Sequence, residues 1–463
     1  MFTNSAVVPY MRMLKEVNVD YLSYESQVFS FDTQEGFSLY FSDDLVELRD
    51  PYQKEMSEKL ASLCAVIDAK PSQIRYAIPA AQLATYTRRA LEDLPLAVDP
   101  TCKLIIVDRS IDMVSPLLHE FTYLAMLEDV LDKDVIDDEW TQKYMTAEGA
   151  AKERLVVLDE RDPVLYQIRH KHIAESIEWL VSSINAFTKT NELSKGDASS
   201  TDLSGIQTLM HQLPKCQELG AKYSIHLDLA QLMIKEFKER KLEQIASVQQ
   251  DVSTGLDTTG KTFKPAHEFD EMKMMLMDQS IHKEDLLRTI LLLTTSKEFK
   301  ASQIDELLKL GGFGEDEAKA VANMRRLLAK EKEQGSHFSG LSKKNRKKQT
   351  SSVGFELSRW TPLLKHLIEA LSTNKLGEDE YPKMNLSEGE GTGRRPQWAK
   401  SPDSTPKATP KASNRIIVFV IGGITYSEIR AVHELMDTNR RTEIILGSTH
   451  IIKPNEFAID MSF

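Results

Sequence analysis

The chain has 463 residues, of which 41% are hydrophobic, and its formal net charge at pH 7 is −12. A chain of this length holds roughly two to four domains and can bury a sizeable core, which excludes a largely disordered protein. The acidic balance argues against a general nucleic-acid binder, because such proteins need a basic face. Cys64, Cys102 and Cys216 are far apart and predict buried thiols in a reducing compartment, not disulfides or a metal site.

Two further exclusions concern targeting and membranes. The N-terminal segment lacks the continuous apolar core of a signal peptide. No run approaches the ~18 apolar residues that a membrane-spanning helix needs. We therefore expect a soluble, cytoplasmic protein whose contact with a membrane is indirect, through a partner.

The first third of the chain mixes strand and helix patterns. Residues 10–18 predict the end of an amphipathic helix, and residues 19–32 alternate apolar and polar side chains as a strand does. A helix is expected over 51–68 and a short buried strand over 102–110. The Ser-Pro pair that opens 115–131 predicts the start of another helix.

From about residue 160 to 330 the pattern is almost wholly helical. One long helix is predicted over 162–187, with Pro163 in its first turn. A second is predicted over 222–253, where a continuous apolar stripe follows helical spacing. Shorter helices follow at 268–278, 283–295 and 302–310.

The last third contains two segments that predict disorder, 331–352 and 385–414, because they are rich in polar residues, proline or glycine. Strands at 414–423 and 442–450 then flank a helix from Thr425 to about Met436. This strand–helix–strand unit favours a parallel sheet, which needs cover on both faces. We therefore expect its strands to join the sheet containing 102–110. The predicted fold class is α/β plus mostly α: a discontinuous parallel-sheet domain with a large helical insertion domain.

One stretch matches a nucleotide-binding pattern. The sequence GLDTTGKT at 255–262 fits G-x-x-x-x-G-K-[ST], the pattern of a phosphate-binding loop. Such a loop follows a buried strand and opens a helix. Here the preceding residues are helical in period, and Pro265 cannot lie inside a helix that begins at Gly260. A turn between two helices is favoured, and a nucleotide-binding enzyme is the alternative.

We interpret the other candidates for metal-binding, phosphate-binding or catalytic residues as structural. His170 and His172 are two apart on an expected helix, so they cannot easily share a metal. The glycine pair 422–423 favours a tight strand–helix turn over a phosphate site. Asp108 lies at a strand end, where an α/β enzyme places catalytic groups, and Arg109 is its expected ion partner. We predict no catalytic residue, no metal site and no cofactor.

Seven stretches together resemble the SM (Sec/Munc) family of syntaxin-binding proteins. They include LIIVDRSIDMVSPLLHEFTYLAM and RHKHIAESIE, and they occur in family order at 24–32, 104–126, 169–178, 213–230, 356–369, 416–430 and 446–457. The resemblance is to the secretory, plasma-membrane branch. It implies a partial arch without catalytic activity, a monomer that regulates SNARE assembly in vesicle docking and exocytosis. It also implies peripheral recruitment to plasma or secretory membranes.

The resemblance implies a division into domains. Residues 1–20 resemble the last helix of the family's N-terminal α/β domain, most of which this chain lacks. Residues 21–125 and 413–463 resemble the two segments of the middle α/β domain, and 126–412 the mainly helical domain. Because the N-terminal domain cradles closed syntaxin in the family, we do not expect that binding from this chain alone. Contacts with SNARE helices through the helical domain are expected.

In the family a helical hairpin contacts those helices, and here it resembles 222–253 and 268–295, with the turn GLDTTGKTFKPAHEF (255–269) as its tip. A SNARE motif has an apolar heptad stripe, so its receptor needs an exposed apolar groove. The candidates for binding syntaxin-type and vesicle SNAREs are Leu229, Met233, Phe237, Arg240, Phe263, Pro265, Phe269, Met272, Met275 and Leu276. The alternative is that most are hairpin core. Pro265 is expected to limit the second helix, so Pro265→Ala should strengthen vesicle-SNARE binding.

Two segments of the helical domain have their own interpretations. The basic run at 343–348 either contacts anionic lipid or forms a solvated loop, and the solvated loop is favoured. Trp360, in the stretch SRWTP, is expected to anchor packing.

Overall fold

The computed structural model describes residues 19–131, 140–145, 151–156, 158–192, 217–333, 355–386 and 414–463. The helix predicted at 10–18, the basic run at 343–348 and most of the two segments predicted to be disordered lie outside these ranges. The predicted segment 331–352 overlaps the described residues at its start, and there the last helix of the insertion continues to Glu333.

A seven-stranded sheet forms the centre of the fold, in the order β1-β2-β9-β8-β4-β3-β7. The strands are β1 (Leu22–Glu25), β2 (Val28–Ser30), β3 (Lys70–Tyr76), β4 (Val98–Asp108), β7 (Lys383–Asn385), β8 (Asn414–Ile421) and β9 (Thr442–Ser448). Neighbours from β2 to β3 are parallel, and the edge strands β1 and β7 are antiparallel. Strands from both ends of the chain thus share one sheet, as predicted.

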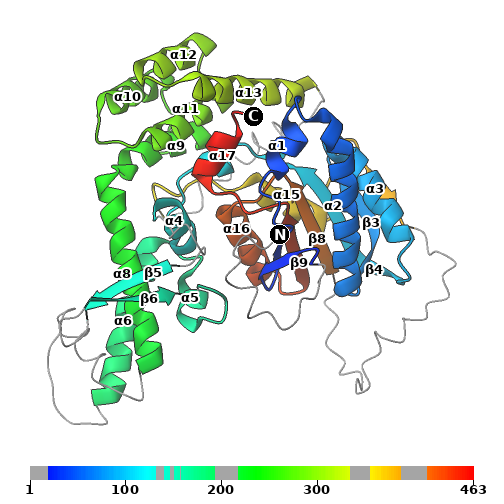
Figure 1. The fold of residues 1–463 in the computed structure, drawn as a ribbon, viewed down its shortest axis with the longest axis horizontal. Helices are drawn as coiled ribbons and strands as arrows, with labels where there is room; N and C mark the ends of the chain where they lie inside the picture. The colour runs from blue at the N-terminus through cyan, green and yellow to red at the C-terminus, as the bar shows by residue number, and fades with distance from the viewer. Residues whose placement is uncertain are drawn as a thin grey trace, which may run out of the picture.

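The sheet is buried on both faces because its central strands are apolar at successive positions. Leu104 and Ile106 of β4 belong to the cluster that includes α2 (Val46–Val66) and α3 (Ala81–Glu92). Ile105 and Val107 point to the opposite face, covered by α15 (Leu363–Ser372) and α16 (Tyr426–Thr438). Short helix α1 (Gly36–Phe41) packs beside α2. Figure 1 shows these helices around the sheet on the right of the view.

The helical insertion lies mainly to the left and top of Figure 1. Its helices are α4 (Tyr123–Val130), α5 (Pro163–Ile168), α6 (Ile173–Glu192), α8 (Gln217–Glu239), α9 (Leu242–Thr254), α10 (Pro265–Met277), α11 (Lys283–Thr295), α12 (Ala301–Leu310) and α13 (Glu315–Glu333). A two-stranded sheet, β5 (Trp140–Met145) with β6 (Ala151–Val156), was not predicted. The C-terminal helix α17 (Pro454–Asp460) packs against α11 and α13.

Three predicted long helices are interrupted in the structure. The helix expected over 162–187 is α5 and α6, because the intervening backbone pairs with the segment before α4: Tyr123 donates to Lys171 and Ile173 donates to Phe121. In 115–131 the Ser-Pro pair opens a short 3-10 helix, Ser115–Leu117, as a helix start was predicted there, but the α-helix begins only at Tyr123. The helix expected over 222–253 is α8 and α9, which are separated where Lys241 takes a left-handed φ of 54°.

The range predicted for the helical domain, 126–412, reaches too far toward the C-terminus. Apolar residues of α15, among them Leu364 and Leu367, lie in the cluster on the sheet. β7 pairs with β3 as an edge strand. Helix α15 and strand β7 therefore belong with the sheet and not with the helical part.

A buried ion pair joins the end of β4 to the start of α16. The Arg109 guanidinium donates to both Glu428 carboxylate oxygens at 2.8 and 2.7 Å, and neither side chain is exposed. Arg109 also donates to the Gly423 carbonyl at 3.2 Å. The predicted Arg109–Asp108 pair is therefore wrong. Asp108 instead accepts from the backbone of Ser110, and burial raises its pKa.

The turn after β8 requires its glycines, as the sequence indicated. Gly422 and Gly423 have φ of 93° and 100°, a region that L side chains rarely adopt. A Cβ on Gly423 would lie 2.4 Å from the Ile452 side chain. This is a tight strand–helix turn, packed too closely for a phosphate.

Two thiols are buried, as predicted. Cys64 and Cys102 are free, and burial raises the pKa of each to about 12. Both are therefore protonated and unreactive at neutral pH. Cys216 lies outside the described residues.

Stability should fall on mild acidification, and His450 is one cause. Burial, aided by the charge of Arg109, lowers the pKa of His450 from 6.5 to about 4. The unfolded chain therefore binds a proton that the folded chain excludes, so the free energy of unfolding decreases as pH falls from about 6.5 toward 4. Chemical denaturation of His450→Gln at several pH values should show a shallower decline, by at most about 1.4 kcal/mol per pH unit.

The control for this prediction is His282→Gln, because His282 is exposed and makes no side-chain cap bond to α11. The pH dependence of that variant should match the parent chain. An unchanged slope in His450→Gln would show that other groups cause the acid sensitivity.

Candidate functional site

The ten residues predicted to contact SNARE helices do not line an open groove. Phe237, Pro265 and Leu276 are half-buried. The other seven are buried in the helical core: Leu229, Met233, Arg240, Phe263, Phe269, Met272 and Met275. Helix α9 packs against α10 and α11, and the apolar members of this set belong to one buried cluster. In this structure most of the ten residues are therefore core, which is the alternative given above, and their contact with SNARE helices stays a prediction.

Arg240 has a structural role at this break. Its Nε donates to Asp285 Oδ2 at 3.0 Å, and His119 Nε2 lies 3.1 Å from Asp285 Oδ1. Burial favours the neutral acid, but hydrogen bonds from His119 and Arg240 and the charges of His119 and Arg288 outweigh it and hold the pKa of Asp285 below its usual range. The network fastens the end of α8 to α11 through a fully ionised carboxylate.

Pro265 occupies the first position of α10. Proline fits this position because its fixed φ suits a helix start and its missing N–H would have no helical partner. Proline also disfavours helical backbone angles at the residue before it, and Lys264 is extended, with a ψ of 106°. Pro265 therefore sets where α10 begins, and the lengthening of α10 and stronger SNARE binding expected for Pro265→Ala stay predictions.

The loop at 255–262 is closed on itself. The Asp257 carboxylate accepts from the backbone N–H groups of Thr259 and Lys261, both at 2.9 Å. The Gly260 N–H donates to the Asp257 carbonyl at 2.9 Å, and Gly255 ends α9 with a φ of 75°. The backbone donors that a phosphate would need are satisfied internally, and the loop follows a helix.

We therefore expect no nucleotide binding at this loop. Titration of the chain with fluorescent ATP and GTP analogues in the presence of Mg²⁺ should give no saturable signal. The variant Lys261→Ala should give the same trace. Micromolar, Mg²⁺-dependent binding that Lys261→Ala abolishes would contradict this expectation.

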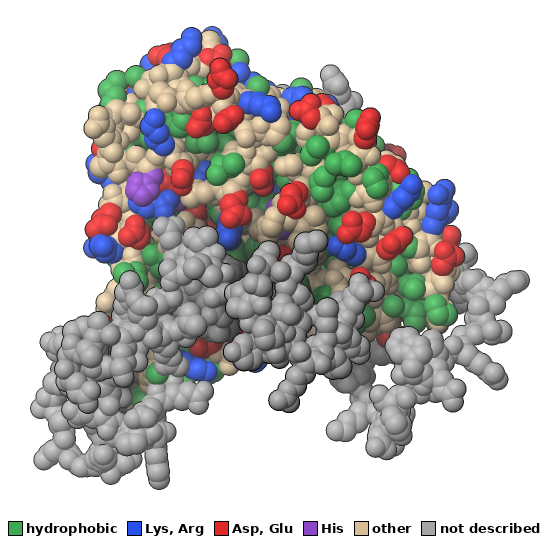
Figure 2. Space-filling view, viewed as in Figure 1, with side chains coloured by type: hydrophobic (Ala, Val, Ile, Leu, Met, Phe, Trp, Pro, Cys, Tyr) green, Lys and Arg blue, Asp and Glu red, His purple; other side chains and the backbone are tan. Residues whose placement is uncertain are grey.

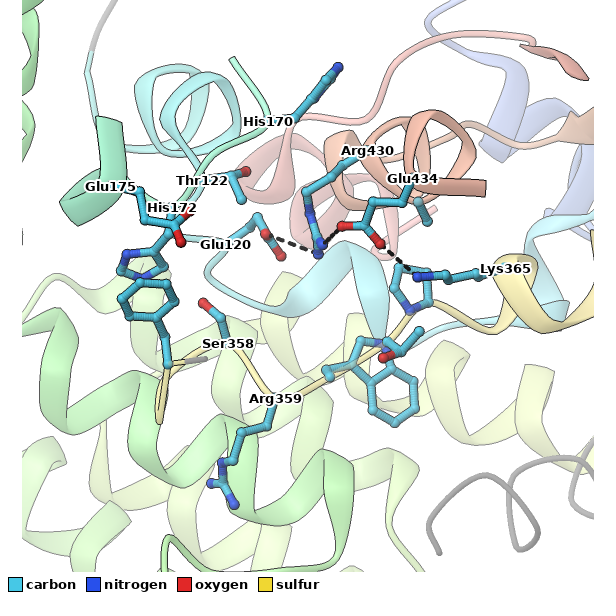
Figure 3. Close-up of a pocket in the computed structure, with 15 residues that line it drawn as sticks. Glu120, Thr122, His170, His172, Glu175, Ser358, Arg359, Lys365, Arg430 and Glu434 are labelled. Atoms are coloured by element: carbon cyan, nitrogen blue, oxygen red, sulfur yellow. Dashed lines mark hydrogen bonds and ion pairs between the residues drawn. The ribbon is translucent and has the colours of Figure 1, made fainter. Parts of the chain in front are cut away.

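A polar pocket of about 260 Å³ lies between the helical part and the sheet. Arg430 of α16 lies 3.3 Å from Glu120 and also pairs with Glu434, which accepts from Lys365 Nζ at 2.6 Å. Figure 3 shows this chain of ion pairs along one side of the pocket. The lining residues are Glu120, Thr122, His170, His172, Glu175, Phe355, Ser358, Arg359, Trp360, Thr361, Pro362, Lys365, Arg430, Ala431 and Glu434.

The stretch SRWTP forms the opposite wall of this pocket and anchors it. The Gln250 side chain accepts from the backbone N–H groups of Arg359 and Trp360, at 2.8 and 2.9 Å. The Trp360 indole donates to Ser115 Oγ at 3.0 Å. Arg359 points away from the pocket in Figure 3 and pairs with Asp251. Trp360 is thus a packing anchor, and the Arg430 and Lys365 cations that line the pocket already have carboxylate partners.

His170 and His172 point in different directions, as predicted. They lie in the segment between α5 and α6, however, and not on one helix. His172 stacks on Phe355 with ring centroids 3.5 Å apart. His170 points away from the pocket centre in Figure 3 and stacks on His433 of α16 at 4.6 Å. Burial lowers the pKa of His172 to about 4 and of His170 to about 2. Both imidazoles are therefore neutral at pH 7.

Helices α6 and α8 form a projecting pair, to which the sequence analysis assigned no binding role. The two helices lie side by side and extend from the body at the lower left of Figure 1. Near the body, the α8 residue His226 is 2.8 Å from the Tyr123 hydroxyl, and Phe237 packs edge-on against Phe121 at 5.2 Å. Beside His226, Leu227 forms a small separate apolar cluster with Ile184 of α6.

Aromatic side chains lie across the outer part of this pair. The Tyr223 ring is 6.1 Å from both Trp179 and Phe187 of α6, and all three are half-buried. Leu219, one turn before Tyr223 on α8, is 36% exposed. We call Trp179, Phe187, Leu219 and Tyr223 the distal surface. The sequence predicted a helix over 162–187, but only the three-dimensional pairing of α6 with α8 identifies the surface.

The described surface in Figure 2 shows acidic and basic side chains interspersed. Among the described helices, none is both long and apolar enough to cross a bilayer.

Together, the fold and these sites define a scaffold: a covered parallel sheet that carries a helical insertion with a projecting helix pair. The Sec1 family model matches residues 1–460, and the chain belongs to this family. It is 29% identical to the protein transport protein sec1 of Dictyostelium discoideum, over 98% of this chain and 78% of that protein. It is 27% identical to the SNARE-interacting protein KEULE of Arabidopsis thaliana, over 98% and 77% respectively.

Solved structures share the fold. One is the Unc18–syntaxin 1 complex from Monosiga brevicollis, with a TM-score of 0.76 and 22% identity, over 96% of this chain and 76% of that chain. Another is the SM protein Vps45 in complex with the Qa SNARE Tlg2 (1–310), with a TM-score of 0.67 and 18% identity, over 96% and 74%. The predicted family and fold class are confirmed.

Proposed function

We propose that this chain is a non-enzymatic SNARE-binding protein that regulates SNARE assembly in vesicle docking, exocytosis and membrane fusion. Membership of the Sec1 family supports this function. So do the names of its relatives and neighbours, which include a SNARE-interacting protein and complexes with syntaxin 1 and a Qa SNARE. The observation that carries the proposal is the projecting pair α6–α8 with its distal surface.

The physical requirement is an elongated apolar receptor. A SNARE motif is a long helix with an apolar stripe, and such a helix binds against a groove formed by other helices. The outer part of α6–α8 presents aromatic rings on two adjacent helices, so a third helix can pack along them. Half-buried tryptophan and tyrosine suit this role because they supply a large apolar area at low cost in side-chain entropy.

The remaining parts of the proposal follow from the same function. We infer that the chain acts as a monomer in the cytoplasm and reaches plasma or secretory membranes through its SNARE partners. A catalytic role has no support at the pocket, because Arg430, Lys365 and Glu434 neutralise one another there. In the 255–262 loop the backbone N–H groups of Thr259, Gly260 and Lys261 already donate to Asp257.

A direct binding measurement tests this function. The purified chain is titrated by calorimetry with the cytoplasmic regions of a panel of syntaxin-type and vesicle SNAREs, and with a parallel coiled coil unrelated to SNAREs. We expect saturable binding to at least one SNARE and none to the unrelated coiled coil. Equal binding to all helices, or to none, would contradict the proposal.

A further inference from the structure

Three potential metal ligands from distant parts of the chain converge beside the sheet. They are Glu25 at the end of β1, His170 between α5 and α6, and His433 on α16. Their ligand atoms all lie within 4.8 Å of one another. His433 Nε2 is 2.7 Å from Glu25 Oε2, and His170 Nε2 is 3.9 Å from the same oxygen.

The distances fit a tetrahedral metal after small rotations. Zinc binds imidazole nitrogen and carboxylate oxygen at about 2.0–2.2 Å, so two ligand atoms of one ion lie roughly 3.4 Å apart. The two observed separations lie on either side of this value. The stacked histidine rings direct both Nε2 atoms toward the same carboxylate oxygen.

His170 Nε2 is unsatisfied in the absence of an ion. It is a buried atom without a hydrogen-bond partner, although a buried polar atom normally has one. A metal would satisfy this nitrogen through its lone pair. If the cluster served only for the hydrogen bond between His433 and Glu25, the missing partner of His170 Nε2 would have no explanation.

The surroundings hold the carboxylate in a ligating position. Arg169 Nη1 lies 3.2 Å from Glu25 Oε1, which leaves Oε2 for the ion. Arg169 also donates to Glu160 at 2.9 Å, so its charge is shared between two carboxylates. Such partners orient metal-binding carboxylates in known sites. Glu25, Arg169 and Glu160 together carry one negative charge, which favours a cation, and the nearby Arg430 is itself paired with Glu120 and Glu434.

We propose that Glu25, His170 and His433 form a site for a divalent transition metal of the zinc class, with solvent in the fourth position. Two imidazoles and one carboxylate are a ligand set that zinc accepts, and three protein ligands plus water are typical of open sites. The His170 and His433 side chains are 22% and 16% exposed, so the cluster lies near the surface although its ligand atoms face inward. The bound metal links the helical part to both β1 and α16.

Cobalt titration of the full chain, purified without a histidine tag and freed of metal, tests the site. Tetrahedral Co²⁺ should give intense visible absorption that saturates at one ion per chain and disappears on adding Zn²⁺. In His170→Gln and His433→Gln the affinity should fall by more than about 100-fold, since losing a partner that only orients a ligand costs roughly 10–100-fold. Circular dichroism checks that both variants fold.

His172→Gln is the matched control, because His172 is two residues from a ligand but stacks on Phe355 instead. Its cobalt spectrum and affinity should equal those of the parent chain. Zn²⁺ should also raise the melting temperature of the parent chain and of this control, but not of the two ligand variants. Absent visible bands, or weak binding that all the variants retain, would overturn the proposal and indicate only adventitious surface binding.

Discussion

Arg109→Met is expected to lower the free energy of unfolding by about 3–5 kcal/mol, because it leaves the Glu428 carboxylate buried without its counter-charge. Neither side chain of this pair is exposed to solvent. The pair joins β4 to α16, and Glu428 also accepts from the Thr425 backbone at the helix start. Urea denaturation followed by circular dichroism measures the loss.

A double variant separates the cost of an unpaired charge from the loss of contact. Arg109→Met combined with Glu428→Gln removes both charges, while glutamine can still cap the helix. It should be more stable than Arg109→Met alone. Arg415→Met is the matched control, because Arg415 pairs with Glu443 at 2.7 Å but the two are 25% and 33% exposed. That change should cost less than about 1 kcal/mol. Equal losses in Arg109→Met and Arg415→Met would refute the argument from burial.

Trp179→Ala is expected to weaken SNARE binding by at least about 30-fold, or roughly 2 kcal/mol, if the distal surface is the receptor. The reason is that Trp179 of α6 packs beside Tyr223 of α8 and supplies the largest aromatic side chain of that surface. Leu219→Glu should act in the same direction, since it puts a charge where the SNARE helix packs. Calorimetric titration with the SNARE that binds the parent chain measures both effects.

The matched control for this prediction is Leu232→Lys. Leu232 is on the same helix and is 47% exposed, but its helical position is on a different side from Leu219 and Tyr223. Its affinity should match the parent chain, and the melting temperatures of all variants should be compared. If Leu232→Lys weakens binding while Trp179→Ala does not, the receptor lies on the other side of α8.

The sheet was predictable because its strands are continuous apolar runs. Buried runs such as 104–107 and 416–421 allow few alternatives to a doubly covered parallel strand. The strand β3 was missed because Lys70–Tyr76 mixes charged and polar residues with apolar ones. Arg75 is buried there by donating to the carbonyls of Leu376 and Tyr381, contacts that lie about 300 residues away along the chain and leave no local signal.

The candidate site was harder to predict, for two physical reasons. Apolar residues at helical spacing indicate a buried face, but they do not show which neighbour covers it. Thus Met272 and Met275 are core, and the exposed helix pair lies elsewhere. Helix breaks were missed because the pairing of 121–124 with 169–173 and the left-handed Lys241 depend on tertiary contacts. The cluster of Glu25, His170 and His433 likewise has no spacing that a sequence pattern can reveal.

Hydrogen exchange of the chain with and without its SNARE partner tests the proposed binding surface most directly. Amides of α6 and α8 near Trp179 and Tyr223 should exchange more slowly in the complex, while those of the sheet and of α10 should be unchanged. Protection confined to other elements, with α6 and α8 exchanging equally fast in both states, would contradict the assignment of the projecting pair as the SNARE receptor.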